Sequence, residues 1–172
     1  MQHLNSAACE HQFLNSGVTP LDRTDREILA CLQEDATMPV AEIARRVGLS
    51  STPCWRRIQK LEESKVIRGR VALLDSRKLN VGMTAFVSIR TSQHSLEWLE
   101  KFAEAVREMP EVVELYRMSG EIDYLLRVVV PDIDAYDRFY KKLIAKIQLS
   151  DVSSSFAMEQ IKYTTALPLD YA

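Results

Sequence analysis

Apolar residues recur every three to four positions in three consecutive segments, residues 22–35, 40–47 and 51–61. This spacing puts the apolar side chains on one face of a helix, so each segment is predicted to form an amphipathic helix. In the third segment the apolar stripe consists of Cys54, Ile58 and Leu61. Gly48 precedes this helix, at a turn that commonly needs a backbone angle closed to most residues. Two short helices joined by a tight turn predict a helix-turn-helix.

Beyond residue 82 the pattern alternates between strand and helix periods. The predicted strands are residues 83–91, 112–118, 124–130 and 152–163, and the predicted helices are 95–109 and 133–147. The order βαββαβ is typical of a ferredoxin-like domain, an antiparallel four-stranded sheet with both helices on one face. We expect the other face to carry Phe86, Val113 and Leu126. A second copy of the chain is the simplest cover for such a face, so we expect a homodimer.

The fold class predicted from these elements is α+β, with an N-terminal winged helix-turn-helix domain and a C-terminal ferredoxin-like domain. A short basic stretch at residues 66–75 is interpreted as the wing or a connecting strand. The predicted parts are a flexible N-terminal tail, a winged helix-turn-helix domain, a linker and a ferredoxin-like domain, at residues 1–20, 21–74, 75–82 and 83–172.

Positive charge is confined to one part of the chain. Residues 45–70 hold eight basic and two acidic residues, although the whole chain has a net charge of −2. A basic run alone more often marks a solvated helix face. Its coincidence with the predicted helix-turn-helix favours binding to the phosphate backbone of DNA.

Composition indicates where in the cell the protein is expected and which kinds of site it is expected to lack. The 172 residues are 47% hydrophobic and include no apolar run long enough to cross a membrane, for which about 18 residues are needed. No secretory signal is visible, and the three cysteines, Cys9, Cys31 and Cys54, lack the spacing of metal ligands. We therefore expect a cytoplasmic protein with no membrane contact, no metal site and no cofactor.

The third helix is predicted to read DNA through the residues outside its apolar stripe. Arg56 and Gln59 have the chemistry to bind guanine and adenine edges, whereas hydroxyl and ammonium groups suit phosphate oxygens. Trp55 either contacts sugar or a thymine methyl, or packs over the wing or the first helix. The predicted DNA-binding residues are Ser51, Thr52, Trp55, Arg56, Arg57, Gln59, Lys60, Arg68 and Arg70.

Two of the residues in this helix have a competing structural role. Arg57 lies beside the apolar stripe and could instead bridge the acidic residues of the first helix. Cys54 lies in a basic neighbourhood, which would lower the pKa of a thiol and make it a redox sensor. Its place in the apolar stripe favours a small core residue instead.

Four motifs, in their order and spacing, carry a family resemblance. They are residues 21–29, 57–62, 66–69 and 120–124. With them the chain resembles the Lrp/AsnC, or feast/famine, family of bacterial and archaeal transcription regulators. The resemblance implies that the sheet domain dimerises, that dimers assemble into octamers, and that a small effector, usually an amino acid, binds between sheet domains. Residues 51–55 and 154–165 resemble the cysteine-responsive branch of that family, which implies cysteine as the effector.

The loop at residues 120–124 matches the effector loop of the family. An acidic side chain beside the backbone amides of a glycine loop can bind both the ammonium and the carboxylate of an amino acid. Without the resemblance, an ordinary polar hairpin turn would be the better interpretation. The predicted effector-binding residues are Met118, Ser119, Gly120, Glu121, Asp123, Tyr124, Ser153, Ser155, Thr164 and Thr165.

We therefore predict a sequence-specific transcription regulator that binds a palindromic double-stranded operator and responds to an amino acid. One alternative is an architectural DNA-binding protein that responds to no effector. A second, an enzyme on a ferredoxin-like fold, is weaker, because no nucleophile and base pair is visible and no glycine loop would cradle a phosphate. The histidines, His3, His11 and His94, lie in the predicted tail or just after a strand.

Overall fold

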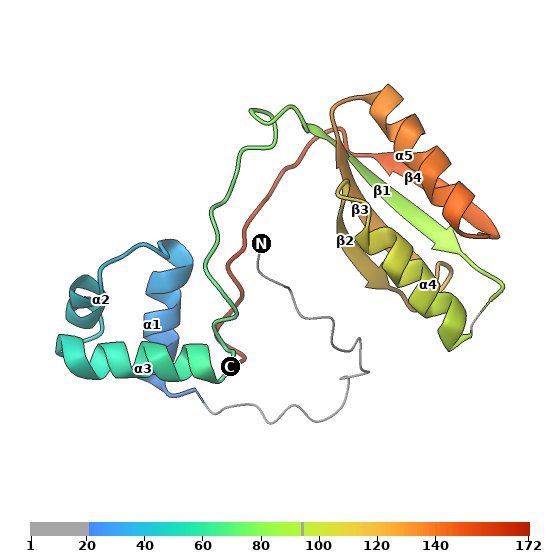
Figure 1. Cartoon of the computed structure of the whole chain (residues 1–172). Coiled ribbons are helices and arrows are strands. Elements are labelled where there is room, and N and C mark those ends of the chain that lie inside the picture. The colour runs from blue at the N-terminus through green and yellow to red at the C-terminus, as the bar shows by residue number, and fades with distance from the viewer. Residues whose placement is uncertain (1–20, 94) are drawn as a thin grey trace. The chain divides into compact units, whose positions relative to one another are not determined.

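The computed structural model describes residues 21–93 and 95–172, which form two compact units (Figure 1). The helical unit comprises the described residues up to Val71 together with Thr164–Ala172, and the sheet unit comprises Ala72–Tyr163. The predicted tail at residues 1–20 lies outside the described residues, as does His94. The C-terminal nine residues thus cluster with the helical unit, although the sequence pattern placed them in the sheet domain.

The helical unit has the three predicted helices, α1 (Arg23–Glu34), α2 (Val40–Arg46) and α3 (Ser51–Glu63). A capping box starts α1, because the Asp22 carboxylate accepts from the Asp25 backbone N–H and the Asp25 carboxylate accepts from the Asp22 N–H. Gly48 has φ +69°, the left-handed conformation that glycine adopts without steric cost, and so confirms the turn before α3.

The apolar stripe of α3 is buried in the core of this unit. Cys54, Ile58 and Leu61 pack with Ile28 of α1 and Ile43 of α2, as the spacing predicted. Cys54 is fully buried, and this burial raises the pKa of its thiol. The redox-sensor interpretation required a lowered pKa, so Cys54 is a core residue instead.

The predicted wing strand is wrong. Residues 64–82 contain no strand, and the backbone N–H of Ile67 donates to the Leu61 carbonyl, which closes the end of α3. Further along, Val71 and Leu74 are 81% and 70% exposed. A strand needs a hydrogen-bonded neighbour, and this stretch pairs with none among the described strands.

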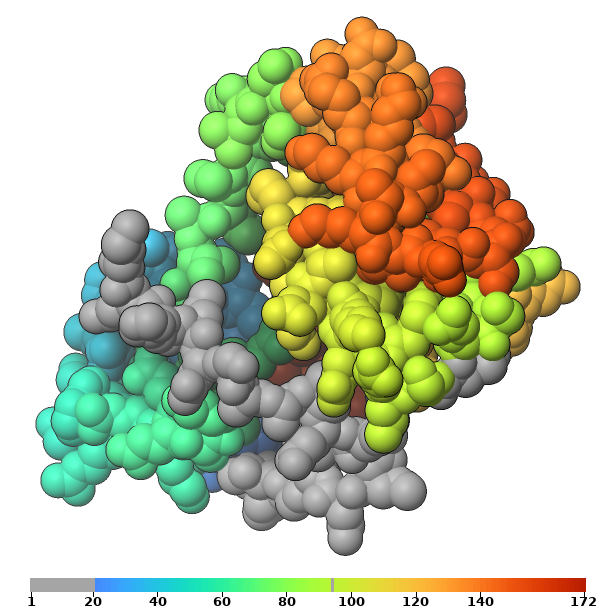
Figure 2. Space-filling view, turned by 45° about the vertical axis from the view of Figure 1, so that its right-hand side comes forward, coloured from blue at the N-terminus to red at the C-terminus, as the bar shows by residue number. Residues whose placement is uncertain are grey.

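The sheet unit has the predicted βαββαβ order. Its elements are β1 (Met83–Arg90), α4 (Leu96–Arg107), β2 (Val112–Arg117), β3 (Tyr124–Val130), α5 (Ile133–Lys146) and β4 (Asp151–Phe156). The antiparallel sheet has the strand order β2-β3-β1-β4, and both helices lie on one face (Figure 1). In the space-filling view, α4 (yellow-green) and α5 (orange) form the outer surface of this unit (Figure 2).

Side-chain alternation separates the covered face of the sheet from the open face. Val87 and Leu126 are fully buried under the helices, whereas Phe86 and Val113 are 39% and 45% exposed. The open apolar face is thus confirmed for Phe86 and Val113. Leu126 was assigned to the wrong face, because its position in β3 pairs it with Val87 on the covered side.

The last strand is shorter than predicted. β4 ends at Phe156, and residues 157–163 are irregular. The last link to the sheet is the bond from the Ala157 N–H to the Thr84 carbonyl, 2.9 Å long, next to the start of β1. Beyond this point β1 offers no backbone to pair with, so the strand stops before residue 163.

Candidate DNA-reading helix and ligand loop

The outward face of α3 carries the predicted DNA-binding side chains. Five of them are exposed in the structure, namely Ser51, Thr52, Arg56, Gln59 and Lys60. They lie outside the buried stripe of α3, and the turquoise part of Figure 2, which includes the start of α3, lies at the surface. The helix therefore presents hydroxyl, amide and cationic groups together to the outside of its unit.

Trp55 lies on this surface too. Its side chain is 48% exposed and borders a shallow hollow with Val40, Ser51 and Thr52. Residues 64–82 form no wing strand against which it could pack. The indole therefore adds an apolar contact area to an otherwise polar surface, as a thymine methyl or a sugar would require.

Arg57 forms ion pairs with acidic residues of the first helix and its cap, which is the alternative to DNA contact that the sequence suggested. Its Nη1 lies 2.6 Å from Asp22 Oδ2 and 2.7 Å from Asp25 Oδ1. The pKa of Asp22 is lowered, first by the hydrogen bond from the Asp25 backbone N–H and then by the Arg57 guanidinium. Because both carboxylates also form the capping box, Arg57 fixes the reading helix α3 against the start of α1.

The remaining predicted cations follow the end of α3. Arg68 and Arg70 are exposed, and Arg70 Nη2 lies 2.9 Å from Glu62 Oε1. Both belong to the irregular segment that replaces the predicted wing. A surface pair of this kind contributes little to stability, so Arg70 can exchange its carboxylate for a phosphate at small cost.

The predicted effector loop joins β2 to β3 at one end of the sheet. The Met118 N–H donates to the Asp123 carbonyl over 2.8 Å, and the Asp123 N–H donates to the Ile89 carbonyl of β1 over 2.9 Å. Gly120 has φ +112°, a conformation that side chains rarely adopt. The loop is thus closed at its base, while Met118, Ser119, Gly120 and Glu121 are exposed.

Asp123 is occupied by a structural contact. Its Oδ2 accepts the backbone N–H of Thr91 over 2.8 Å, in a partly buried setting. This bond joins the loop to the first residue after β1. The sequence predicts that this carboxylate binds a ligand, and in the structure one of its oxygens also helps to position the loop.

Tyr124 points away from the loop into the core. Its ring lies 5.8 Å from Trp98 and 4.8 Å from Phe102, measured between ring centroids. The side chain is 7% exposed, and burial raises the pKa of its hydroxyl. Tyr124 therefore supports the loop from beneath.

The other predicted effector residues lie apart from the loop. Ser153 and Ser155 are exposed on the open face of β4, opposite Ser88 and Phe86 of β1. β4 and β2 are the two edges of the sheet, so these hydroxyls lie across the sheet from the β2–β3 loop. Thr164 and Thr165 cluster with the helical unit. Within one chain, the structure brings together only the members between Met118 and Asp123.

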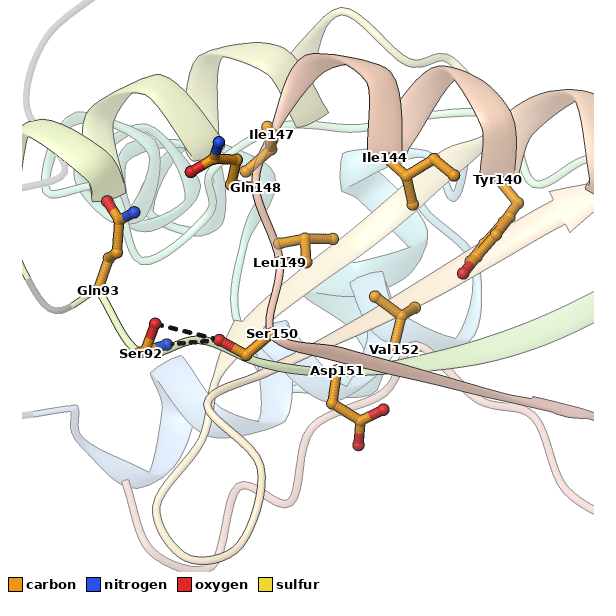
Figure 3. Close-up of a pocket in the computed structure, with 10 residues that line it drawn as sticks. All are labelled: Ser92, Gln93, Tyr140, Ile144, Ile147, Gln148, Leu149, Ser150, Asp151 and Val152. Atoms are coloured by element: carbon orange, nitrogen blue, oxygen red, sulfur yellow. Dashed lines mark hydrogen bonds between the residues drawn. The ribbon is translucent and has the colours of Figure 1, made fainter.

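A polar cleft at the same end of the sheet was missed from the sequence. It encloses about 620 Å³ between the end of β1, the end of α5 and the start of β4 (Figure 3). The Ser92 N–H donates to Ser150 Oγ over 2.9 Å, and Gln93, Gln148 and Asp151 lie around the rim. The available signal was a polar run after β1 and another before β4, because paired strands bring such runs together.

The open face of the sheet carries a charged network beside its apolar residues. Arg127 Nη2 lies 2.6 Å from Glu114 Oε1, and the Tyr116 hydroxyl donates to the other oxygen of Glu114 over 2.9 Å. Arg127 and the Tyr116 hydrogen bond both lower the pKa of Glu114, against the effect of its partial burial. Phe86 lies opposite Arg127 in the register of β1 and β3.

Two kinds of feature are missing from the described part of the chain. Residues 21–93 and 95–172 contain no cluster of three or more histidine, cysteine, aspartate or glutamate residues that could hold a metal ion. Within the same residues, no helix has the length and apolar character needed to span a membrane.

Two family models match the chain. The AsnC-type helix-turn-helix domain matches residues 21–62, and the Lrp/AsnC ligand binding domain matches residues 84–167. The chain belongs to the Lrp/AsnC family. The protein is therefore a DNA-binding transcriptional regulator with a ligand-binding domain, and it is not an enzyme. The family and the α+β fold class predicted from the sequence are confirmed, except for the wing strand.

Curated relatives and solved structures cover nearly the whole described chain. The DNA-binding transcriptional activator DecR of Escherichia coli (strain K12) is 53% identical over 151 residues, which are 87% of this chain and 99% of DecR. The glutamate uptake regulatory protein of Zymomonas mobilis is 50% identical over 152 residues, which are 88% of this chain and 93% of that protein.

Among solved structures, an AsnC family transcriptional regulator from Agrobacterium tumefaciens is 70% identical with a TM-score of 0.85 and covers 88% of this chain and 99% of its own. A transcriptional regulator from Neisseria meningitidis in complex with L-Met is 37% identical with a TM-score of 0.84, at the same coverage.

Proposed function

We propose that this Lrp/AsnC regulator reads its operator with the outward face of α3. Arg56 and Gln59 contact base edges, while Ser51, Thr52 and Lys60 bind phosphate oxygens. The observation that carries the proposal is that α3 buries its apolar stripe and exposes these groups outside it. Arg68 and Arg70 add backbone contacts. Arg57 takes no direct part in base reading, because Asp22 and Asp25 already hold it.

The ligand in this proposal is an amino acid bound at the β2–β3 loop. The family model for the sheet unit is a ligand-binding domain, and the relative from Neisseria meningitidis is titled as a complex with L-Met. The exposed backbone at Ser119 and Gly120 offers donors for a carboxylate, and Glu121 offers an acceptor for an ammonium group. The resemblance of residues 51–55 and 154–165 to the cysteine-responsive branch makes cysteine the first ligand to test.

A second copy of the chain completes the assembly. The open sheet face exposes Phe86 and Val113 beside the network of Arg127, Glu114 and Tyr116. A twofold pairing of this face buries the apolar residues and sets two helical units on a palindromic operator, with half-sites one helical turn or a multiple apart. Dimers of this kind can assemble further, up to octamers. In such assemblies Ser153, Ser155, Thr164 and Thr165 of other copies can complete the ligand site.

The test is an operator-binding titration on the promoter region of the protein's own gene, with each of the twenty amino acids at one fixed salt concentration. We expect cysteine to change the operator Kd, and a change with another amino acid would reassign the ligand. If no amino acid alters the Kd, the effector proposal fails. The result would then favour the alternative of an architectural DNA-binding protein that responds to no effector. Equal affinity for the promoter and for random DNA would refute sequence-specific reading.

A further inference from the structure

The last residues of the chain pack against α1 of the helical unit. The Leu167 N–H donates to Gln33 Oε1 over 2.7 Å, and Gln33 Nε2 donates to the Leu167 carbonyl over 3.1 Å. Further along, Arg26 Nη1 donates to the Ala172 carbonyl oxygen over 3.0 Å. A single glutamine side chain thus satisfies both backbone groups of Leu167, in the manner of a neighbouring strand.

This segment forms one wall of an apolar groove. Its walls are α1, the irregular stretch after α3 and the segment itself, and they include Leu29, Leu32, Val66 and Ile67. Leu169 packs against the core cluster of the helical unit, whereas Leu167 is 72% exposed. Residues two positions apart share a face in a regular extended chain, so the segment departs from regular alternation where Leu169 packs inward and Leu167 faces out.

The sequence of the segment suits an ordered, docked peptide. Pro168 lies between the two leucines, and proline restricts the backbone and so reduces the entropy lost on docking. Proline also has no N–H, so the hydrogen bonds of this stretch fall on its neighbours. Gln33 supplies both partners of Leu167, which sets the register of the segment along α1.

Docking of this segment makes the sheet unit an insertion in the helical unit. The chain leaves the helical unit after Val71 and re-enters it at Thr164 (Figure 1). The two connections adjoin neighbouring strands at one end of the sheet, because the Ala157 N–H donates to the Thr84 carbonyl next to the start of β1. The β2–β3 loop lies at the opposite end, where Ile89 pairs with Tyr124.

We infer that residues 164–172 form a strap that binds along α1 of the same chain, closes one side of the groove and completes the fold of the helical unit. The side of α1 that carries Gln33 is an interaction surface, and its partner is this chain's own C-terminal segment. The strap thereby ties the ligand-binding unit to the DNA-reading unit through a second connection. This inference concerns the folded protein alone and does not depend on the proposed ligand.

The test compares Leu169→Ala with Leu167→Ala in the full chain. The two substitutions remove the same atoms two residues apart, but only Leu169 packs against the core. We expect Leu169→Ala to lower the melting temperature of the helical unit by about 5 °C or more, and Leu167→Ala to lower it by less than half as much. Equal effects of the two substitutions would overturn the inference.

A second test measures hydrogen exchange of the Leu167 amide in Gln33→Ala, a variant that keeps the apolar contacts of Leu169. We expect exchange at least about tenfold slower in the wild-type protein than in Gln33→Ala, because the donor loses its acceptor. The same rate in both proteins would mean that the segment does not dock through Gln33.

A mixing experiment decides whether the strap acts within one chain. Leu169→Ala and Gln33→Ala proteins are mixed under conditions that exchange subunits. If the strap docks in its own chain, every copy keeps one defect and the mixture melts no higher than the separate proteins. If it docks in a second copy, mixed dimers contain one intact groove with an intact strap, and part of the lost stability returns. That recovery would refute docking within one chain.

Discussion

The contact between Asp123 and Thr91 predicts how the ligand loop responds to mutation. In Asp123→Ala the Thr91 N–H loses its carboxylate acceptor, which lies 2.8 Å away in a partly buried setting. A hydrogen bond to a charged group contributes about 1.5–3 kcal/mol, and partial exposure brings the expected loss to about 1–2 kcal/mol. For a unit the size of residues 72–163, this loss lowers the melting temperature by roughly 4–15 °C.

Asp123→Asn separates a positioning role from direct ligand contact. The asparagine Oδ1 can still accept the Thr91 N–H, so we expect most of the stability to return and the amino-acid response to persist. Asp123→Ala should lose both the Thr91 bond and the response. The measurements are thermal unfolding, hydrogen exchange of the Thr91 amide, and operator titration with and without amino acid.

One result would refute this reasoning. If Asp123→Asn is as stable as the wild-type protein but does not respond to any amino acid, the charge of Asp123 binds the ligand directly. Glu121→Gln is the matched control, since Glu121 is exposed and its nearest cation is Arg90 at 3.6 Å. This control should leave the stability unchanged and weaken binding of the ligand's ammonium group.

Three further predictions follow from the helical unit and the open sheet face. Arg56→Ala combined with Gln59→Ala should weaken operator binding about 10-fold to 100-fold while leaving affinity for random DNA nearly unchanged, as measured by competition titration at fixed salt; equal losses on both DNAs would contradict base reading. Arg57→Ala should lower the unfolding temperature at pH 7. The folded-state pKa of Asp22 is depressed below 3.8, so the difference in unfolding temperature between Arg57→Ala and wild type should persist above that pH and shrink as the pH falls through the lowered pKa. A difference in unfolding temperature that does not change down to pH 2 would exclude the Arg57–Asp22 pair as its source. Phe86→Glu should shift the sedimentation profile toward smaller species, and an unchanged profile would move the dimer interface off the open face.

The sequence predicted elements better than it predicted contacts. The three N-terminal helices and the βαββαβ order follow from local periodicity, which each segment carries by itself. The face of a strand depends on its register, and register depends on the neighbouring strand. That dependence explains why Phe86 was placed correctly and Leu126 was not. The end of β4 was predicted too late for the same reason, since residues 157–163 have no described strand beside them.

In the candidate sites, too, features that follow from local sequence could be predicted, whereas contacts between distant residues could not. Exposure of Arg56 and Gln59 and burial of Cys54 follow from a helical wheel, so the reading face could be predicted. The partner of Asp123 could not, because Thr91 lies 32 positions away and donates from its backbone. Tyr124 follows the loop directly in sequence, but strand alternation turns its ring into the core. Local motifs therefore locate the loop, while only the fold assigns each side chain its role.

The strap has a consequence for how the protein is made. Gln33 and Leu167 are 134 positions apart, so their bond forms only after nearly the whole chain has been synthesised. At about 5–20 residues per second, a ribosome needs roughly 7–27 s to cover that distance. During this interval α1 has been made, but the segment that packs along it has not. A nascent chain therefore lacks the contact of Leu169 with the core of the helical unit until the last residues are added.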